Sequence, residues 1–472
     1  MDMRVLAADF RTVPLHMRMP FRYGIVTVQG MTHCVVRVRV EIDGREEIGC
    51  AADSLAPKWF VKNPETGIAE DVAALERIVA DACALAIGCG EAASVFELWL
   101  RVHEEMHVSC VRDVDGVLRP PLLLAFGASL IERALIDAVC RAREISFHDA
   151  LRSDVLGFAP EMLHAELRGH TAAVLLPRAP LRSVRVRHTV GWLDALAEEQ
   201  VDRELGDDGL PRSLAACIRE YGLTHFKIKV SGDPARDLAR LRDVALLLDA
   251  QRAEYFCTLD GNEQFSSFDA FRELWRAIER EPALERLRRA LLFIEQPLPR
   301  AISLSAETGA SLRAWGDRPA IIIDEADGET HSLRTALDLG YAGGSHKNCK
   351  GVFRGAANAC LIAHRGVGVQ TGEDLTNVGP VALLQDLTVM ASLGITHVER
   401  NGHHYFRGLS MMPVQVNDAV LTAHGDAYRR HADGFAVLDV RGGELAVGSM
   451  VDAPFGYADP VRPFDLFGPE HE

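Results

Sequence analysis

Three short stretches decide the fold of this chain: LDGN at 259–262, IEQP at 294–297 and IDEAD at 323–327. In each stretch an acidic residue directly follows a run of apolar, strand-forming residues, and these acids are Asp260, Glu295 and Asp324. A carboxylate at the end of a buried strand is costly unless it is paired or bound to a metal. The intervals of 35 residues (260 to 295) and 29 residues (295 to 324) match successive strand–helix units. We therefore expect consecutive strands of one α/β barrel whose carboxylates converge on a hard cation such as Mg²⁺.

A second signal precedes the acids in HFKIKV, which places Lys227 and Lys229 two residues apart. Side chains alternate along a strand, so both ammonium groups point the same way. Their repulsion and partial burial are expected to lower a lysine pKa toward that of a usable base. The alternative is an edge strand with two solvated lysines. A third lysine, Lys347, ends another apparent strand in GGSHKNCKG, where the competing interpretation is a surface lysine beside Lys350.

The rest of the sequence divides into an α+β part and a part in which strands and helices alternate. Residues 3–50 alternate as strands, with a hairpin turn expected at Asp43–Gly44, and the helical period takes over from about 67 to 150. From roughly 183 to 400 strands and helices alternate, which favours a parallel barrel. The candidate strands are SVRVRHTV, THFKIKV, YFCTLD, LLFIEQ, AIIID, GGSHK, VGVQTG and ITHVE. In such a barrel the site lies at the C-terminal strand ends, where the acids and lysines fall.

The order of these motifs resembles that of the enolase superfamily, and in particular its muconate-lactonizing-enzyme branch within the mandelate racemase/muconate lactonizing enzyme family. That order is Lys-x-Lys, Asp with Asn two positions on, Glu-Gln-Pro, Asp-Glu, and a final Lys. MPFRYG at 19–24 is similar to the family's early substrate loop, and LIERALIDAVCR at 130–141 to the helix before its barrel. The resemblance implies a TIM-type (β/α)7β barrel with an α+β capping domain formed by the N-terminal region and the C-terminal tail.

We expect the capping domain at 1–155, the catalytic barrel at 156–409 and a returning tail at 410–472. Residues 153–182 are rich in Pro and Leu without a clear period, which indicates an inserted connection between the first two parts.

The resemblance also implies roles for the site residues. Asp260, Glu295 and Asp324 would hold one Mg²⁺ per subunit, and the metal would stabilise the enolate-like dianion left after proton removal. Lys229 would be the base on one face, with Lys227 as its orienting neighbour. Lys347 would be the partner on the other face.

Several polar residues are candidates for supporting roles. Asn262 and Glu325 would bond to the metal-binding carboxylates, or be ordinary loop residues. Glu373 and Asp374 would bind a cationic or hydroxylated part of the substrate, or cap the following helix. Specificity candidates lie where the family's first-domain loops cover the site: Arg22, Tyr23, Asp53 and Lys58.

Lysines on both faces of a bound carboxylate favour a racemase or epimerase, while the same residues also support a dehydratase, another lyase or a cycloisomerase. At two positions the sequence departs from the motifs of particular branches of the family. VQTGED has no histidine at the seventh strand end, which disfavours the mandelate-racemase branch with its His–Asp dyad. THVERNGHH lacks the Asp-x-Asp of dipeptide epimerases. A homo-oligomer is expected from the resemblance.

Two alternatives belong to other classes. HEEMH at 103–107 matches His-Glu-x-x-His, which on a helix would make His103 and His107 zinc ligands and Glu104 the base of a zinc protease. A non-enzymatic barrel is the other alternative, and the intact lysines and acids argue against it. Metal analysis separates these hypotheses.

Composition limits the partners. A net charge of −16 and a pI near 5.6 argue against nucleic-acid or anionic-membrane binding. The resemblance implies a small-molecule carboxylate as the partner. No apolar run is long enough to span a bilayer, and the first residues lack the apolar core of a signal peptide. Ten cysteines without a Cys-x-x-Cys pair favour a reduced, cytoplasmic protein.

Overall fold

The computed structural model describes residues 1–113 and 115–458, and it begins with an antiparallel sheet. β1 (Met3–Tyr23), β2 (Val26–Ile42), β3 (Arg45–Leu55) and the short β4 (Glu91–Ala92) lie in the order β3-β2-β1-β4. The β2–β3 hairpin turns at Asp43 and Gly44, whose φ angles are 49° and 80°. Positive φ at both central residues is the requirement of a type I′ turn, so the predicted hairpin is confirmed.

Helices complete the N-terminal part: α1 (Ile68–Gly88), α2 (Val95–Ser109), α3 (Pro121–Ala142) and α4 (Phe147–Arg152). α3 is buried from Leu122 to Cys140 because it packs on β2 and β3 and also contacts the segment that follows β10. A helix covered on every side reads as an almost uninterrupted apolar run, as the sequence of α3 does. α3 therefore joins the capping sheet to the barrel.

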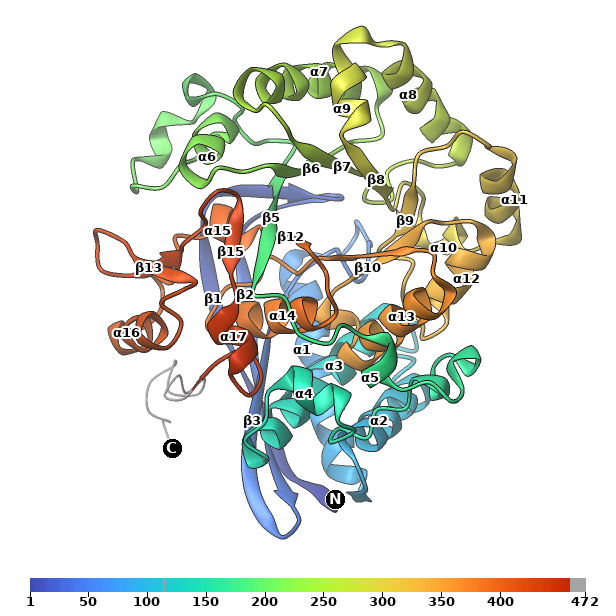
Figure 1. The fold of residues 1–472 in the computed structure, drawn as a ribbon, viewed down its shortest axis with the longest axis vertical. Coiled ribbons are helices and arrows are strands. Elements are labelled where there is room, and N and C mark those ends of the chain that lie inside the picture. Colours follow the sequence, from blue (N-terminus) through green and yellow to red (C-terminus); the bar gives the residue numbers. More distant parts are fainter. Residues whose placement is uncertain (114, 459–472) are drawn as a thin grey trace.

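The second part is a parallel barrel (Figure 1). Within the described residues eight parallel strands follow one another around it, and β12 pairs with β5 to close the ring. The strands are β5 (Ser183–Val190), β6 (His225–Lys229), β7 (Phe256–Asp260), β8 (Leu291–Glu295), β9 (Ile321–Ile323), β10 (Gly343–His346), β11 (Val369–Gly372) and β12 (His397–Glu399). Each predicted strand is found, and the predicted fold class is confirmed.

Helices connect the strands on the outside of the barrel, as α7, α8, α12 and α13 show in Figure 1. The connecting helices are α6 (Leu214–Tyr221), α7 (Pro234–Gln251), α8 (Phe268–Arg280), α9 (Glu285–Arg289), α10 (Arg300–Ser303), α11 (Ala306–Ala314), α12 (Ser332–Leu339), α13 (Val352–Arg365) and α14 (Ala382–Ser392). Several begin at a serine or aspartate side chain that accepts a backbone N–H, as Asp233 does for α7. The inserted connection contains α5 (Ala172–Leu175), which packs on α13.

The tail contacts both parts of the molecule. It contains α15 (Gly402–Tyr405), α16 (Val414–Ala423), β13 (Tyr428–Arg430), β14 (Ala436–Leu438), β15 (Glu444–Ala446) and α17 (Gly448–Asp452). β15 pairs antiparallel with β5, and α17 packs on α14. Further along, the Tyr457 hydroxyl donates to Asp137 of α3. The tail therefore returns to the capping part while it also extends the barrel sheet, and the domain bounds 1–155, 156–409 and 410–472 stay a prediction.

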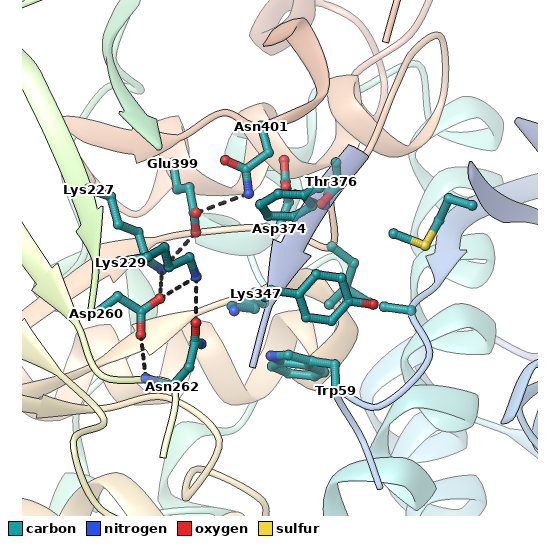
Figure 2. A pocket seen from close by; sticks show the side chains of 15 residues that line it. Trp59, Lys227, Lys229, Asp260, Asn262, Lys347, Asp374, Thr376, Glu399 and Asn401 are labelled. Carbon is teal, nitrogen blue, oxygen red and sulfur yellow. Dashed lines mark hydrogen bonds and ion pairs between the residues drawn. The ribbon is translucent and has the colours of Figure 1, made fainter. Parts of the chain in front are cut away.

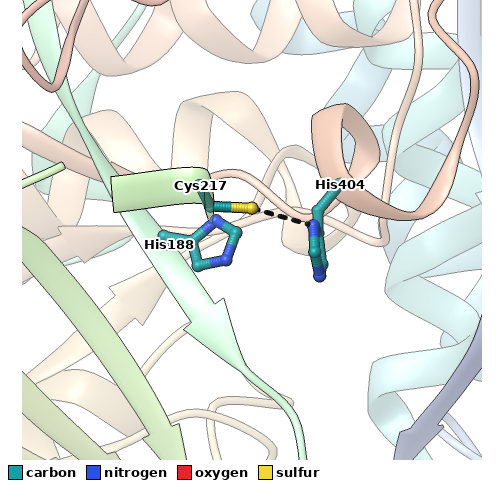
Figure 3. A group of neighbouring side chains, drawn as sticks. All are labelled: His188, Cys217 and His404. Carbon is teal, nitrogen blue, oxygen red and sulfur yellow. Dashed lines mark hydrogen bonds between the residues drawn. The ribbon is translucent and has the colours of Figure 1, made fainter. Parts of the chain in front are cut away.

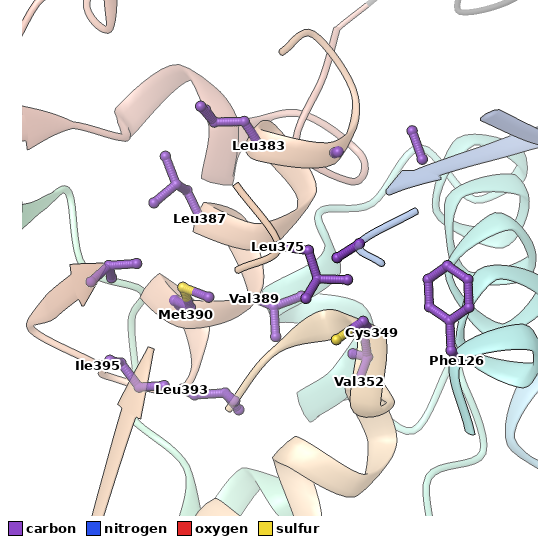
Figure 4. Packing of buried hydrophobic residues seen from close by; sticks show 14 of the residues in the cluster. Phe126, Cys349, Val352, Leu375, Leu383, Leu387, Val389, Met390, Leu393 and Ile395 are labelled. Carbon is purple, nitrogen blue, oxygen red and sulfur yellow. The ribbon is translucent and has the colours of Figure 1, made fainter. Parts of the chain in front are cut away.

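One continuous apolar core links the two parts. Figure 4 shows Leu387 and Met390 on one side of α14 and Val389 on the side of Cys349 and Val352, with Phe126 of α3 beyond them. Glu132 of α3 accepts hydrogen bonds from the backbone N–H groups of Val352 (2.8 Å) and Phe353 (2.6 Å). The capping helix thus supplies acceptors for the first turn of a barrel helix. No described helix is both long and apolar enough to cross a membrane.

Candidate active site

The strand register brings the site residues to one level. Lys229 of β6 pairs with Asp260 of β7, and Asp260 pairs with Glu295 of β8. Among the residues that directly follow Asp260, Glu295 and Asp324, only Gln296 has a positive φ angle (36°). The Gln296 side-chain oxygen accepts hydrogen bonds from the backbone N–H groups of Asp324 (2.8 Å) and Ala326 (3.1 Å). In the Glu-Gln-Pro motif the glutamate thus points into the barrel mouth, and the glutamine stabilises the loop that follows β9.

Lys227 lies at the centre of the acidic residues. Its Nζ is 2.7 Å from Glu373, 2.8 Å from Glu399, 2.9 Å from Glu295 and 3.0 Å from Asp260. Burial opposes the charged amine, but these four carboxylates raise the pKa of Lys227 well above its ordinary value. The expectation that lysine–lysine repulsion lowers this pKa is therefore wrong for Lys227, because the carboxylates are much closer partners.

Lys229 points into the barrel mouth beside Lys227, as Figure 2 shows. Its Nζ donates to Asp260 Oδ2 (2.6 Å) and to Asn262 Oδ1 (2.8 Å). The Asn262 backbone N–H donates to the other oxygen of Asp260 (2.9 Å), and its side-chain amide donates to Glu325 (3.3 Å). Asn262 thus orients both the proposed base and a proposed metal-binding carboxylate.

Lys347 enters from the far side of the mouth and binds Asp324 (2.9 Å) and Glu373 (3.3 Å). Lys350 is buried as well, and its Nζ lies 2.9 Å from the other oxygen of Asp324. Neither is a surface lysine. Although burial opposes it, Lys347 and Lys350 hold the pKa of Asp324 well below its usual range. In turn, Asp324 and Glu373 raise the pKa of Lys347 despite its burial.

Three carboxylates are close enough to share one cation. One oxygen from each of Glu295, Asp324 and Glu373 lies within 4.8 Å of the other two, and all three side chains are buried. Burial and the neighbouring Asp260 and Glu373 raise the pKa of Glu295 well above its ordinary value. Crowded, desolvated oxygen ligands are the donor set that Mg²⁺ prefers, so these residues fit the expected metal. Glu373 thus joins two of the predicted ligands, whereas Asp260 faces the lysines.

A small cavity opens above these charges. Lys229, Lys347 and Asn262 form part of its wall, and capping residues form an apolar roof: Phe21, Tyr23, Met31, Ala56 and Trp59. The centroid of the Trp59 ring lies 4.6 Å from the Lys347 Nζ, close enough for a cation–π contact. The cavity therefore has a floor on which lysines and carboxylates alternate and a partly aromatic cover.

The candidates for supporting roles differ in their location and contacts. Tyr23 lines the cavity and its hydroxyl donates to the Pro57 carbonyl (2.7 Å). Asp374 also lines it and pairs with Arg400, and neither Asp374 nor Glu373 caps α14, whose first turn follows Val381. Arg22 lies in an adjoining pocket together with Lys229.

Two specificity candidates lie away from the cavity wall. Asp53 is fully buried in an ion pair with Arg133 of α3 (2.8 Å), and Lys58 pairs with Asp71 (2.9 Å). Both stabilise the capping part. Asp53 lies within β3, where Arg133 of α3 is its ion-pair partner, and Lys58 lies in the loop that follows β3.

Sequence reasoning missed Glu399 and Arg187. Glu399 ends β12 in the same way as the other acids end their strands, so the run ITHVE carried the signal. Thr189 and Asn401 bind its second oxygen at 2.6 Å and 3.0 Å. Arg187 lies inside the barrel on β5 and donates to Glu373 (2.7 Å), and only the closure of the barrel brings these two residues together.

The His-Glu-x-x-His string does not form a metal site with a third ligand among the described residues. The rings of His103 and His107 lie 4.4 Å apart, but His107 Nδ1 contacts the His103 carbonyl of their own helix (2.8 Å). His103 packs against Trp99, and burial lowers its pKa to about 3. This geometry gives the zinc-protease alternative no support.

Comparison with known proteins agrees with the fold and the motifs. Residues 210–430 match the family described as Enolase C-terminal domain-like. The match covers 221 of the 472 residues and includes strands β6 to β12 of the barrel. No curated protein matches this chain in sequence.

Solved structures share the architecture at low identity. An N-succinyl Arg/Lys racemase from Bacillus cereus is 16% identical with a TM-score of 0.57, over 96% of this chain and 98% of that one. A dipeptide epimerase from Enterococcus faecalis, complexed with Mg and a dipeptide, is 13% identical with a TM-score of 0.59, over 94% and 97%. A muconate lactonizing enzyme from Pseudomonas fluorescens is 16% identical with a TM-score of 0.54, over 84% and 87%. These likenesses establish a common fold.

Proposed function

We propose that this chain is a Mg²⁺-dependent racemase or epimerase that removes a proton α to a carboxylate and returns one from the opposite side. The observation that carries the proposal is the position of two lysines. β6 and β10 lie on opposite sides of the described barrel, separated by β7–β9 in one direction and by β11, β12 and β5 in the other. Lys229 and Lys347 therefore flank one cavity from opposite sides.

Glu295 and Asp324 would hold the metal, with Asp260 or Glu373 as the third carboxylate. When bound, Mg²⁺ supplies positive charge where the substrate carboxylate gains negative charge. Different neighbours orient the two lysines. Asn262 and Asp260 aim the Lys229 Nζ from below, while Asp324, Glu373 and the Trp59 ring fix Lys347. Each Nζ thus lies at the cavity wall. Lys347, whose pKa Asp324 and Glu373 raise despite its burial, is set to give a proton, and a Mg²⁺ ion bound by these carboxylates would offset their effect and lower this pKa toward that of a base.

The cavity supports a class of substrate. Lys229 and Lys347 line its floor together with the carboxylates of Asp260, Asp374 and Glu399, and its roof is apolar at Phe21, Met31 and Trp59. The two lysines offer partners for a substrate carboxylate, and the aromatic roof favours an apolar group attached near it. The roof also excludes water from the reacting carbon, which strengthens each electrostatic contact below it. We infer a small carboxylic acid with an apolar or aromatic substituent.

The test is to incubate the protein with Mg²⁺ and a library of chiral carboxylic acids in D₂O, and to follow deuterium at the α-carbon. Deuterium in both configurations of the recovered acid is the expected result. Lys229→Ala should abolish exchange from one enantiomer and Lys347→Ala from the other. Lys58→Ala is the matched control, because Lys58 is a buried lysine paired with Asp71 outside the cavity, and it should leave exchange intact.

Three results contradict the proposal. A product that lacks the elements of water, without exchange into recovered substrate, assigns a dehydratase instead. Formation of a ring without exchange on the second face assigns a cycloisomerase. Full exchange in Lys229→Ala refutes the two-lysine mechanism in every form.

A further inference from the structure

A second group of potential metal ligands lies behind the active site, on the outer side of β5. It consists of His188 on β5, Cys217 on α6 and His404 on α15, shown in Figure 3. Side chains alternate along β5, so Arg187 and Thr189 reach into the barrel to Glu373 and Glu399 while His188 faces outward. The proposed reaction uses none of these three outward-facing residues.

The spacing of the three residues matches metal coordination. One ligand atom of each lies within 4.8 Å of the other two, and all three side chains are buried. Cys217 Sγ is 3.6 Å from His404 Nδ1. Tetrahedral Zn²⁺ with a sulfur at about 2.3 Å and a nitrogen at about 2.0–2.1 Å requires ligand atoms about 3.5 Å apart. The observed edge is therefore the edge of a zinc tetrahedron, although a thiol–imidazole hydrogen bond has a similar length.

Neighbouring groups hold both imidazoles in orientations suited to a metal. His188 Nδ1 lies 3.2 Å from His403 Nε2, so donation to His403 leaves the His188 Nε2 lone pair free. His404 presents Nδ1 to the cysteine and has Nε2 3.9 Å from Asp194. Metal-binding histidines usually have such a partner for the second ring nitrogen.

Charged groups surround the three residues. A Zn²⁺ ion and a Cys217 thiolate together carry one positive charge, and the buried Asp194 carboxylate lies 3.9 Å from His404 Nε2. Asp194 accepts from the Tyr405 hydroxyl (2.7 Å) and the Gly191 backbone N–H (2.7 Å). The Arg18 guanidinium, which donates to the His404 carbonyl (3.0 Å), is paired with Asp208 (2.7 Å).

We propose that His188, Cys217 and His404 bind one Zn²⁺ ion that joins α6 and α15 to the outside of β5. Cysteine and histidine ligands select a borderline-soft metal, whereas the acidic cluster inside the barrel selects a hard one. The site is structural, because it fastens the helix that directly follows Asn401 at the end of β12. His403 and Tyr221 line a pocket beside it, which offers a path for the ion.

The test is equilibrium dialysis of the full-length, metal-free protein against Zn²⁺, with Mg²⁺ in excess to occupy the acidic cluster. Wild-type protein is expected to retain one Zn²⁺ per chain. Cys217→Ser should retain none, and its thermal midpoint should no longer rise with Zn²⁺. Cys257→Ser is the matched control, since Cys257 is a buried cysteine on β7, two strands away from β5, where it contacts the Leu287 carbonyl, and it should behave as wild type.

Cobalt substitution keeps the proposal testable if Cys217→Ser fails to fold. Wild-type protein loaded with Co²⁺ should show the charge-transfer absorption of a cobalt–thiolate bond, and Cys257→Ser should show it too. Equal Zn²⁺ in wild type and Cys217→Ser overturns the proposal. Absence of the cobalt–thiolate band in wild type overturns it as well, and leaves the three residues as a hydrogen-bonded group. Neither result bears on proton exchange at the acidic site.

Discussion

Replacing Lys227 with methionine should destabilise the fold strongly, and Mg²⁺ should restore part of the loss. The Lys227 Nζ is 2.7–3.0 Å from Asp260, Glu295, Glu373 and Glu399, and only 1% of the side chain is exposed. Methionine keeps the length of the chain and removes the charge, so the four carboxylates lose their shared partner. Removing one member of a buried ion pair costs about 3–5 kcal/mol, and we expect a loss at the upper end of that range.

Mg²⁺ distinguishes this site from an ordinary buried ion pair. A cation held by Glu295, Asp324 and a third carboxylate would replace some of the missing positive charge. An ion that binds only the folded state adds about 2.7 kcal/mol at one hundred times its dissociation constant. The measurement is urea unfolding of wild type and Lys227→Met, each with a chelator and with saturating Mg²⁺.

Lys58→Met is the matched control. It makes the same substitution at a buried lysine, but Lys58 pairs with Asp71 in the capping part, away from the acids. Its unfolding free energy should fall by a smaller amount and should respond to Mg²⁺ as wild type does. A Lys227→Met variant as stable as wild type in chelator would refute the electrostatic argument. An equal gain from Mg²⁺ in both variants would show that the ion does not act at the acidic cluster.

Three further results are expected. Glu132→Gln should lower the unfolding free energy by about 1–3 kcal/mol in thermal or urea melts. Each Glu132 oxygen accepts from one backbone N–H group, of Val352 or Phe353, and an amide has only one such oxygen. An unchanged unfolding free energy would contradict this reasoning. Trp59→Ala should raise KM for the substrate more than it lowers kcat, because its ring covers the cavity, whereas a loss confined to kcat would assign it to positioning Lys347. The unfolding free energy should fall as the pH is lowered from 6.5 to 4, because burial lowers the pKa of His33 to about 4 and the folded state then binds fewer protons than the unfolded state. His33→Gln should flatten this part of the pH–stability curve. An unchanged slope would exclude His33 as a contributor.

The strand pattern was sufficient to predict the barrel. The strands are short, and β6, β7, β8 and β12 end at a charged residue, so period and spacing were visible without knowledge of any contact. The acids at 260, 295 and 324 stood out for the same reason, because a charge directly after a buried run has few inexpensive environments. The type I′ turn at Asp43–Gly44 was equally local, since it depends on the backbone freedom of two residues.

The partners of each charge were decided by tertiary structure. Which carboxylates surround Lys227 depends on the closure of β12 onto β5, which brings Glu399 and Glu373 beside residues more than a hundred positions earlier. The same closure reversed the expected direction of the Lys227 pKa, because the sign of a shift depends on the nearest charge in space. Asp53 was misjudged as a candidate for specificity because nothing local to it reveals Arg133.

The zinc group shows the same division. His188, Cys217 and His404 are isolated in the sequence, and none belongs to a recognisable ligand spacing. His103 and His107 have such a spacing but lack a third ligand among the residues that the structure describes. Local sequence determines which residues enter a strand or helix and which face they occupy, whereas a ligand set requires atoms from distant segments within a few ångströms, and only the packing of the whole chain determines that distance.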